Sequence, residues 1–283
     1  MLPLALKILV VLAGLFLFLR WFEYKQVYHP SSNWLTDQPV PGRSAEKVFI
    51  TTADGVKIHG LFYPAPGTSL RPQVAWCYFH GNGGNLSMRP FILEALLSTS
   101  VSVLAIDYRG YGQSEGKPSE QGTYRDADGA YDWLVQRGFP PTKIVVHGES
   151  LGGGVASYLA LGRPVGGLVI QSSFTTLPDI GREKFPFLPV RLVGSIRYPT
   201  RERMPHIHVP VMVMHSPKDQ LMPYHHGQEN FAAANEPKLF WKLNAFHNDF
   251  VVNDGDNYRA GLAAFLVRCF PGEGPEEKLP QRG

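Results

Sequence analysis

Short apolar runs alternate along most of the chain with segments that have helical periodicity. The apolar runs, typical of strands buried on both faces, cover residues 74–79, 101–106, 144–147, 167–170, 211–215 and 238–243. Helical spacing occurs over residues 90–98, 121–137, 151–161, 224–234 and 258–268. Two further apolar stretches, 47–52 and 56–63, flank Asp54-Gly55, which is a hairpin signal. The pattern predicts an α/β fold with a mainly parallel, eight-stranded sheet and helices on both of its faces.

The N-terminal segment is apolar without interruption by strand or turn signals. Residues 2–19 contain one charged residue, Lys7, and the aromatic residues Trp21 and Phe22 follow. This length is near the lower limit for crossing about 30 Å of hydrocarbon, and aromatic residues suit the membrane interface. We predict an apolar helix over residues 1–25 that acts as an uncleaved signal anchor of a single-pass membrane protein.

Two other interpretations of this segment remain open. A cleaved signal peptide needs a small-residue cleavage site, and the residues after Leu19 are Arg-Trp-Phe-Glu-Tyr. A buried core helix would have to be covered on all sides. Basic residues flank both ends of the segment, so the charge pattern does not decide which side of the membrane carries the remaining chain.

The rest of the chain divides by composition. We predict a connector over residues 26–42 and one catalytic domain over residues 43–270. Residues 271–283 are rich in Pro, Gly and charged residues, and we predict a disordered tail there. The net charge of +3 is spread along the chain rather than gathered in stripes, so we expect no nucleic-acid partner. No His or Cys spacing resembles a zinc site, and we expect no metal and no cofactor.

A candidate nucleophile lies between a predicted strand and a predicted helix. The sequence Gly148-Glu149-Ser150-Leu151-Gly152 is a G-x-S-x-G pattern in the strand–turn–helix context that this pattern requires. Gly148 and Gly152 leave room for a tight turn that exposes the Ser150 hydroxyl. We therefore predict Ser150 as the nucleophile of an acyl-transfer reaction.

A serine nucleophile needs a base, and the base needs an acid that orients it. After a serine of this kind, the acid and then the histidine follow along the chain. Asp219 comes after the strand 211–215, and His247 comes after the next strand. We predict Asp219 and His247 in these roles, with Asp179 and Asp249 as rival acids.

The negative charge that develops on a substrate carbonyl oxygen needs hydrogen-bond donors. One is expected to be the backbone amide of Leu151, directly after the nucleophile. The other should come from the glycine-rich loop His80-Gly-Asn-Gly-Gly-Asn85, which follows the third strand. Within this loop we predict Asn82 as the donor.

Together these motifs resemble the α/β-hydrolase superfamily. The resemblance rests on residues 80–85, Asp107-Tyr-Arg-Gly-Tyr-Gly-Gln-Ser114, residues 148–152, Pro217-Lys-Asp219 and His247-Asn-Asp249, and it extends over nearly the whole chain after residue 43. It implies the α/β-hydrolase fold with a small lid. With Tyr28-His-Pro30, the chain looks like the membrane-anchored branch that includes depalmitoylating and lysophospholipid-cleaving hydrolases. The resemblance also implies that Ser150, Asp219 and His247 form a triad, with the Asn82 amide as oxyanion donor.

The lid is expected between the strands 167–170 and 211–215, in a segment that mixes phenylalanines and leucines with basic residues. Such a surface suits an acyl chain with an anionic headgroup, although an ordinary amphipathic helix pair has the same composition. We therefore predict hydrolysis of acyl esters or thioesters of lipids or other acylated substrates. The alternatives are a serine aminopeptidase-like amide hydrolase and a catalytically silent lipid- or protein-binding member. An epoxide hydrolase or dehalogenase would need Asp in place of Ser150.

Overall fold

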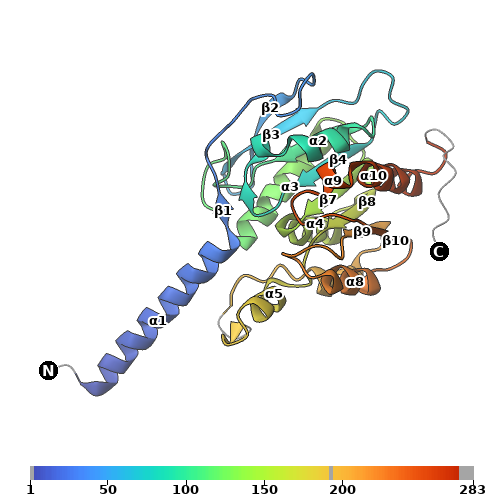
Figure 1. Cartoon of the computed structure of the whole chain (residues 1–283). Coiled ribbons are helices and arrows are strands. Elements are labelled where there is room, and N and C mark those ends of the chain that lie inside the picture. Colours follow the sequence, from blue (N-terminus) through green and yellow to red (C-terminus); the bar gives the residue numbers. More distant parts are fainter. Residues whose placement is uncertain (1–2, 191–193, 274–283) are drawn as a thin grey trace.

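A computed structural model describes residues 3–190 and 194–273 of the chain. At its centre is an eight-stranded sheet with the strand order β10-β9-β8-β7-β4-β6-β3-β2 (Figure 1). Its strands are β2 (Glu46–Thr51), β3 (Lys57–Tyr63), β4 (Ala75–Phe79), β6 (Ser102–Ile106), β7 (Ile144–Glu149), β8 (Gly167–Gln171), β9 (Val211–His215) and β10 (Lys238–Lys242). Strand β3 is antiparallel to both of its neighbours, and the other pairs are parallel. The predicted mainly parallel sheet is confirmed.

Helices cover both faces of this sheet. One face carries α3 (Glu120–Gln136), α4 (Leu151–Gly162), α7 (Thr200–Arg203) and α8 (Tyr224–Ala233), and the other carries α2 (Pro90–Leu97), α9 (Phe250–Asn253) and α10 (Gly255–Cys269). Neighbouring residues of a central strand enter opposite cores: Val146 packs into the first and Val145 into the second. Because both sides of such a strand are buried, its sequence is continuously apolar rather than alternating.

Helix α1 (Leu4–Val27) projects from this body as a single long rod (Figure 1). It is apolar enough to cross a membrane, with a mean hydropathy of 2.2, and is exposed from Leu4 to Phe18. After Tyr28, the next two residues form β1 (His29–Pro30), which pairs in parallel with β5 (Gly83–Gly84). The segment 26–42, which the sequence predicts as an irregular connector, thus contributes one short strand to a two-stranded sheet that is separate from the central sheet.

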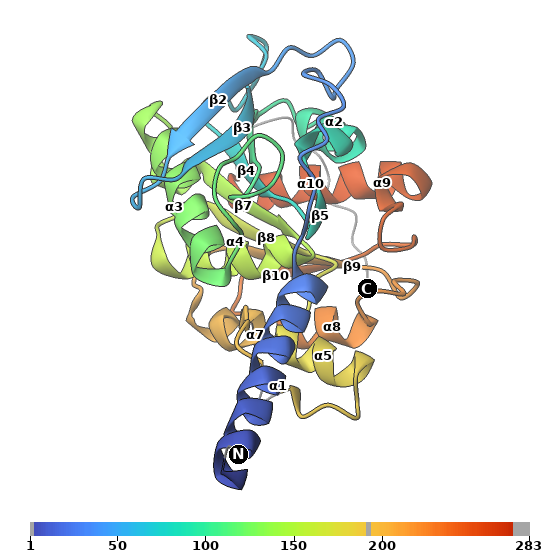
Figure 2. The same ribbon diagram turned by 90° about the vertical axis from the view of Figure 1, so that its left-hand side faces the viewer.

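The predicted lid segment leaves the sheet after β8. It contains α5 (Leu177–Lys184) and α7, while Arg191 and Leu192, two members of its basic and apolar set, lie outside the described residues. Helix α5 lies beside the base of α1, and both project from the same end of the molecule (Figure 2). Most of the predicted tail, residues 274–283, also lies outside the described residues. The four-part division of the chain stays a prediction.

Candidate active site

Ser150 occupies a sharp turn between β7 and α4. Its backbone has φ +53° and ψ −114°, a conformation that a non-glycine residue adopts at a cost. A Cβ atom at Gly148 would lie 2.1 Å from the carbonyl oxygen of Gly152, and one at Gly152 would lie 2.0 Å from that of Phe79. The turn therefore excludes side chains on both sides of Ser150. Among the described residues, the Ser150 hydroxyl has no hydrogen-bond partner, although the residue is 95% buried by its neighbours.

The loops after β9 and β10 bring Asp219 and His247 together. Nδ1 of His247 donates to Oδ2 of Asp219 over 2.7 Å. The other carboxylate oxygen accepts hydrogen bonds from the amides of Leu221 (2.9 Å) and Met222 (2.8 Å). Burial raises the pKa of Asp219, but the hydrogen bond and charge of His247 outweigh it, and the net pKa is lowered. Asp219 is thus held ionised against the imidazole ring.

The two rival acids face other partners. Asp179 lies in α5, where it accepts a hydrogen bond from the Thr175 hydroxyl over 2.9 Å. Asp249 precedes α9 and accepts from the Asn253 side chain over 2.7 Å. Asp219 is the carboxylate that the structure places in hydrogen-bond contact with the His247 ring.

The loop after β4 lies against the nucleophile turn. The Asn82 carbonyl accepts from the backbone amide of His29 (3.1 Å) and from the Tyr111 hydroxyl (2.9 Å), and the Asn82 side chain donates to the Val27 carbonyl over 3.1 Å. These contacts fix the peptide planes of the loop. Within the described part of the chain, the backbone amides of Asn82 and Leu151 donate no hydrogen bond of their own. Two amide donors are thereby left available beside Ser150.

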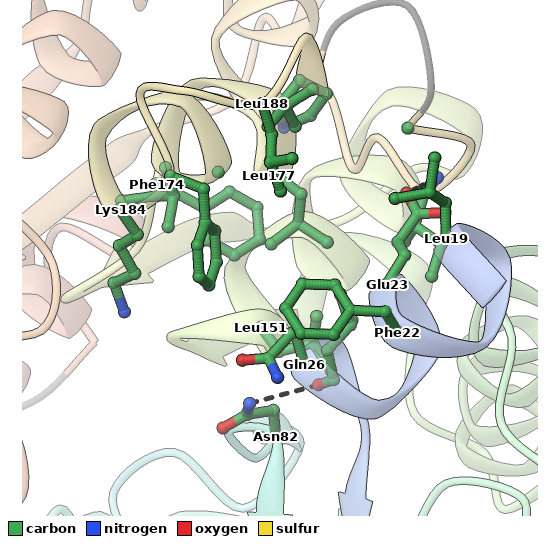
Figure 3. A pocket seen from close by; sticks show the side chains of 18 of the residues that line it. Leu19, Phe22, Glu23, Gln26, Asn82, Leu151, Phe174, Leu177, Lys184 and Leu188 are labelled. Atoms are coloured by element: carbon green, nitrogen blue, oxygen red, sulfur yellow. Dashed lines mark hydrogen bonds between the residues drawn. The ribbon is translucent and has the colours of Figure 1, made fainter. Parts of the chain in front are cut away.

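A cavity of about 180 Å³ lies next to these residues. One end is lined by Asn82, Ser150 and Leu151. The walls are mostly apolar and come from α5 and from α1, with Leu177 and Leu188 opposite Phe22 (Figure 3). The arrangement can hold an apolar group with a polar end at Ser150.

Comparisons with known proteins identify the family. Residues 77–194 match the family model described as alpha/beta hydrolase fold. The Mycobacterium tuberculosis protein Rv2307c is 36% identical over 273 residues, which cover 94% of this chain and 95% of that protein. The chain belongs to the α/β-hydrolase fold family.

Two other similarities bear on this hydrolase. Lysophosphatidylserine lipase ABHD12 of Danio rerio is 32% identical over 181 residues, which cover 57% of this chain and 47% of that protein. The solved structure of the Pyrococcus furiosus esterase Pf2001 superposes with a TM-score of 0.70, covers 86% of this chain and 98% of its own, and is 22% identical. This second likeness concerns the fold alone.

One buried charge of the hydrolase site was not singled out from the sequence. Glu149, directly before Ser150, accepts a hydrogen bond from the Tyr78 hydroxyl and lies 3.7 Å from a guanidinium nitrogen of Arg89. Burial raises the pKa of this carboxyl, but the Arg89 charge and the Tyr78 hydroxyl lower it by more. The pKa of Glu149 is therefore below its ordinary value. The available signal in the sequence was an acidic residue at the end of a predicted buried strand, directly before the candidate nucleophile.

The histidine pair on α8 needs a correction. The sequence offers no plausible third ligand near His225 and His226, but Glu183 of α5 lies 3.1 Å and 3.3 Å from their Nε2 atoms. The Thr175 amide donates to Nδ1 of His226, so the neutral ring carries its proton on Nε2, toward Glu183. His225 is thus hydrogen-bonded to Glu183 between α8 and α5, while Nε2 of His226 lies 3.3 Å from the same carboxylate without a hydrogen bond to it.

Proposed function

We propose that this hydrolase is a membrane-anchored serine hydrolase that cleaves acyl ester or thioester bonds. The observation that carries the proposal is the strained Ser150 turn, which opens into an apolar cavity beside two unpaired backbone amides. A serine is held in this costly conformation only where surrounding structure maintains it, which is typical of active sites. The ABHD12 protein, named a lysophosphatidylserine lipase, supports a lipid-like ester as the substrate class.

The proposed reaction has two acyl-transfer steps. Ser150 Oγ attacks the carbonyl carbon while Nε2 of His247 takes the hydroxyl proton, and Asp219 stabilises the resulting imidazolium. The amides of Asn82 and Leu151 bind the oxyanion, and each such donor typically contributes about 10²–10³ in rate. The C–O or C–S bond then breaks, and His247 returns the proton to the leaving group. Water, deprotonated by His247, releases the acid and restores Ser150.

The helix α1 provides the proposed membrane attachment. It lies near the N-terminus, and the side chains of its most apolar 18 residues are not buried by the rest of the protein. These side chains are free to contact lipid. A cleaved signal sequence has the same composition. The contacts of the last turns of α1 with the catalytic domain favour an anchor that stays in place.

The test is labelling of the detergent-purified full chain with a fluorophosphonate, in wild type and Ser150→Ala, followed by hydrolysis of p-nitrophenyl esters and of an aminoacyl amide. We expect labelling only in the wild type, and ester turnover that falls by about 10⁴- to 10⁶-fold in Ser150→Ala. Turnover of the amide without the esters would select the peptidase alternative. Folded wild type that takes no label would instead support the silent, ligand-binding alternative.

A further inference from the structure

One face of the proposed anchor helix forms a wall of the cavity. The α1 residues that line it are Leu19, Phe22, Glu23, Gln26 and Val27. Their spacing is i, i+3, i+4, i+7 and i+8, which is a single stripe along a helix. Trp21 and Lys25, which lie between these positions, are exposed. At a rise of 1.5 Å per residue the stripe is about 12 Å long, so the cavity follows the helix for two turns.

The opposite wall is the lid, and it is tied to the same helix. Oε1 of Glu23 accepts from the amides of Ser195 (2.7 Å) and Ile196 (3.0 Å), and Oε2 accepts from the Ser195 hydroxyl (2.9 Å). At the preceding position of the helix, the rings of Phe22 and Phe185 meet edge to face with centroids 5.6 Å apart. The cavity thus lies between α1 and a lid that α1 itself holds in position, and Figure 3 shows Phe22 of α1 across from Leu177 and Leu188 of the lid.

The length of α1 places this pair of walls at the membrane surface. The exposed portion, Leu4 to Phe18, measures about 22 Å, whereas the hydrocarbon core is about 30 Å thick. A helix that begins at Leu4 and crosses the whole core would therefore reach the far surface at about Glu23. The lid lies beside that point, and its Phe187 is 79% exposed, as expected of a side chain that meets lipid.

We propose that the cavity takes its substrate from the membrane in which α1 is anchored: an amphiphile with an acyl chain enters between α1 and the lid and lies along the α1 stripe. This inference rests on the proposed function, since the ester group would then reach Ser150 at the inner end of the cavity. The outer end, at Leu19, lies nearest the hydrocarbon. At this end an acyl chain can pass from the bilayer into the cavity without entering water. The free-energy cost of exposing the chain to water is thereby avoided.

The experiment uses the full chain reconstituted in phosphatidylcholine vesicles, with a fluorogenic long-chain ester in the bilayer and p-nitrophenyl butyrate in the water. Leu19→Trp fills the outer end of the stripe, and Leu17→Trp makes the same change on the exposed side of the helix. We expect Leu19→Trp to lower the ratio of long-chain to short-chain turnover by about tenfold, and Leu17→Trp to leave it unchanged. Equal ratios in the two variants would overturn the assignment of α1 as a cavity wall.

Entry from the membrane has its own readout in the same system. The long-chain ester is supplied either in the vesicles that carry the wild-type protein or in a second, protein-free population. We expect at least about tenfold faster hydrolysis when protein and ester share a bilayer, and equal rates would contradict the proposed route. Failure of the proposed function is distinguishable, because a protein without serine hydrolase activity would take no fluorophosphonate and would hydrolyse neither ester.

Discussion

Asp219 and Asp179 are the two aspartates that lie between Ser150 and His247 in the chain, and they differ in what they contact. Replacing Asp219 with Asn would turn an acceptor for the His247 Nδ1 proton into a group that also presents donors. We expect kcat for p-nitrophenyl esters to fall by about 10³–10⁴-fold, because the imidazole loses its orientation and the stabilisation of its charged form.

Asp179→Asn serves as the matched control, since Asp179 lies in α5 and accepts a hydrogen bond from the Thr175 hydroxyl. Its kcat should stay within the same order of magnitude as the wild type. Steady-state kinetics of both variants, with thermal unfolding as a check of folding, decide between the two acids. A larger loss in Asp179→Asn than in Asp219→Asn would reverse the assignment.

His147 makes the stability of the protein dependent on pH. The ring is fully enclosed in β7, with Nε2 2.9 Å from the Gln171 side-chain oxygen, and burial lowers its pKa to about 4. The ordinary value of 6.5 applies to the unfolded chain, which therefore takes up the proton first as the pH falls. This group stabilises the folded state above pH 6.5, and that contribution is lost progressively between about pH 6.5 and 4.

The corresponding variant is His147→Gln, which keeps a donor for Gln171 and removes the titrating group. The fall in melting temperature between pH 7 and pH 4.5 should be smaller in His147→Gln than in the wild type, as measured by thermal unfolding in detergent. The same replacement at exposed His206 should leave the pH dependence as it is in the wild type. An unchanged pH dependence in His147→Gln would show that other groups cause the acid sensitivity.

At the scale of elements, Glu23 is the link between α1 and the lid. Glu23→Ala removes the acceptors for the amides of Ser195 and Ile196 at once. We expect faster proteolytic cleavage within residues 185–197, by several-fold, because the loop loses its attachment and opens more often. Lys25→Ala, on the exposed side of the same helix, should cleave at the wild-type rate. Mass spectrometry of limited digests measures both, and identical cleavage rates would contradict the role of Glu23.

The elements also show why some features could be predicted from sequence and others could not. The strands and the Ser150 turn depend on local signals: continuous apolar runs, paired glycines and the order of acid and histidine. The wall formed by α1 depends on contacts between residues 19–27 and 174–196, which a single sequence does not encode locally. An apolar helix that lines a cavity has the same composition as one that only spans a membrane. Glu23, an acidic residue near the end of that helix, was the available clue.

The same limit applies to the segment after α1. Its prolines and polar residues predict an irregular connector, but His29 and Pro30 pair with the loop that carries Asn82. A two-residue strand has no periodicity to detect. This pairing bears on function. The backbone amide of His29, which donates to the Asn82 carbonyl, lies two residues after the end of α1. The short segment that follows α1 therefore connects the proposed anchor to the loop that carries the proposed oxyanion donor.

Across the whole molecule, the cavity, the lid and the anchor lie at one end of the sheet (Figures 1 and 2). This placement separates the two main interpretations of the N-terminal segment. A signal peptidase that cut after the apolar core would remove Leu19 from the cavity wall and would leave Glu23, the partner of Ser195, on a short N-terminal stub. An anchor leaves both contacts intact.

We therefore expect the mature protein to retain α1 through Val27. Intact-mass measurement of the protein purified from membranes should match a chain that begins at or near Met1, and alkaline carbonate should fail to release it from those membranes. A soluble chain that starts beyond about residue 20 and still hydrolyses long-chain esters would contradict both the anchor and the cavity wall. A soluble chain of that kind that hydrolyses only short-chain esters would contradict the anchor alone, because loss of the α1 stripe removes the surface along which a long acyl chain is proposed to lie.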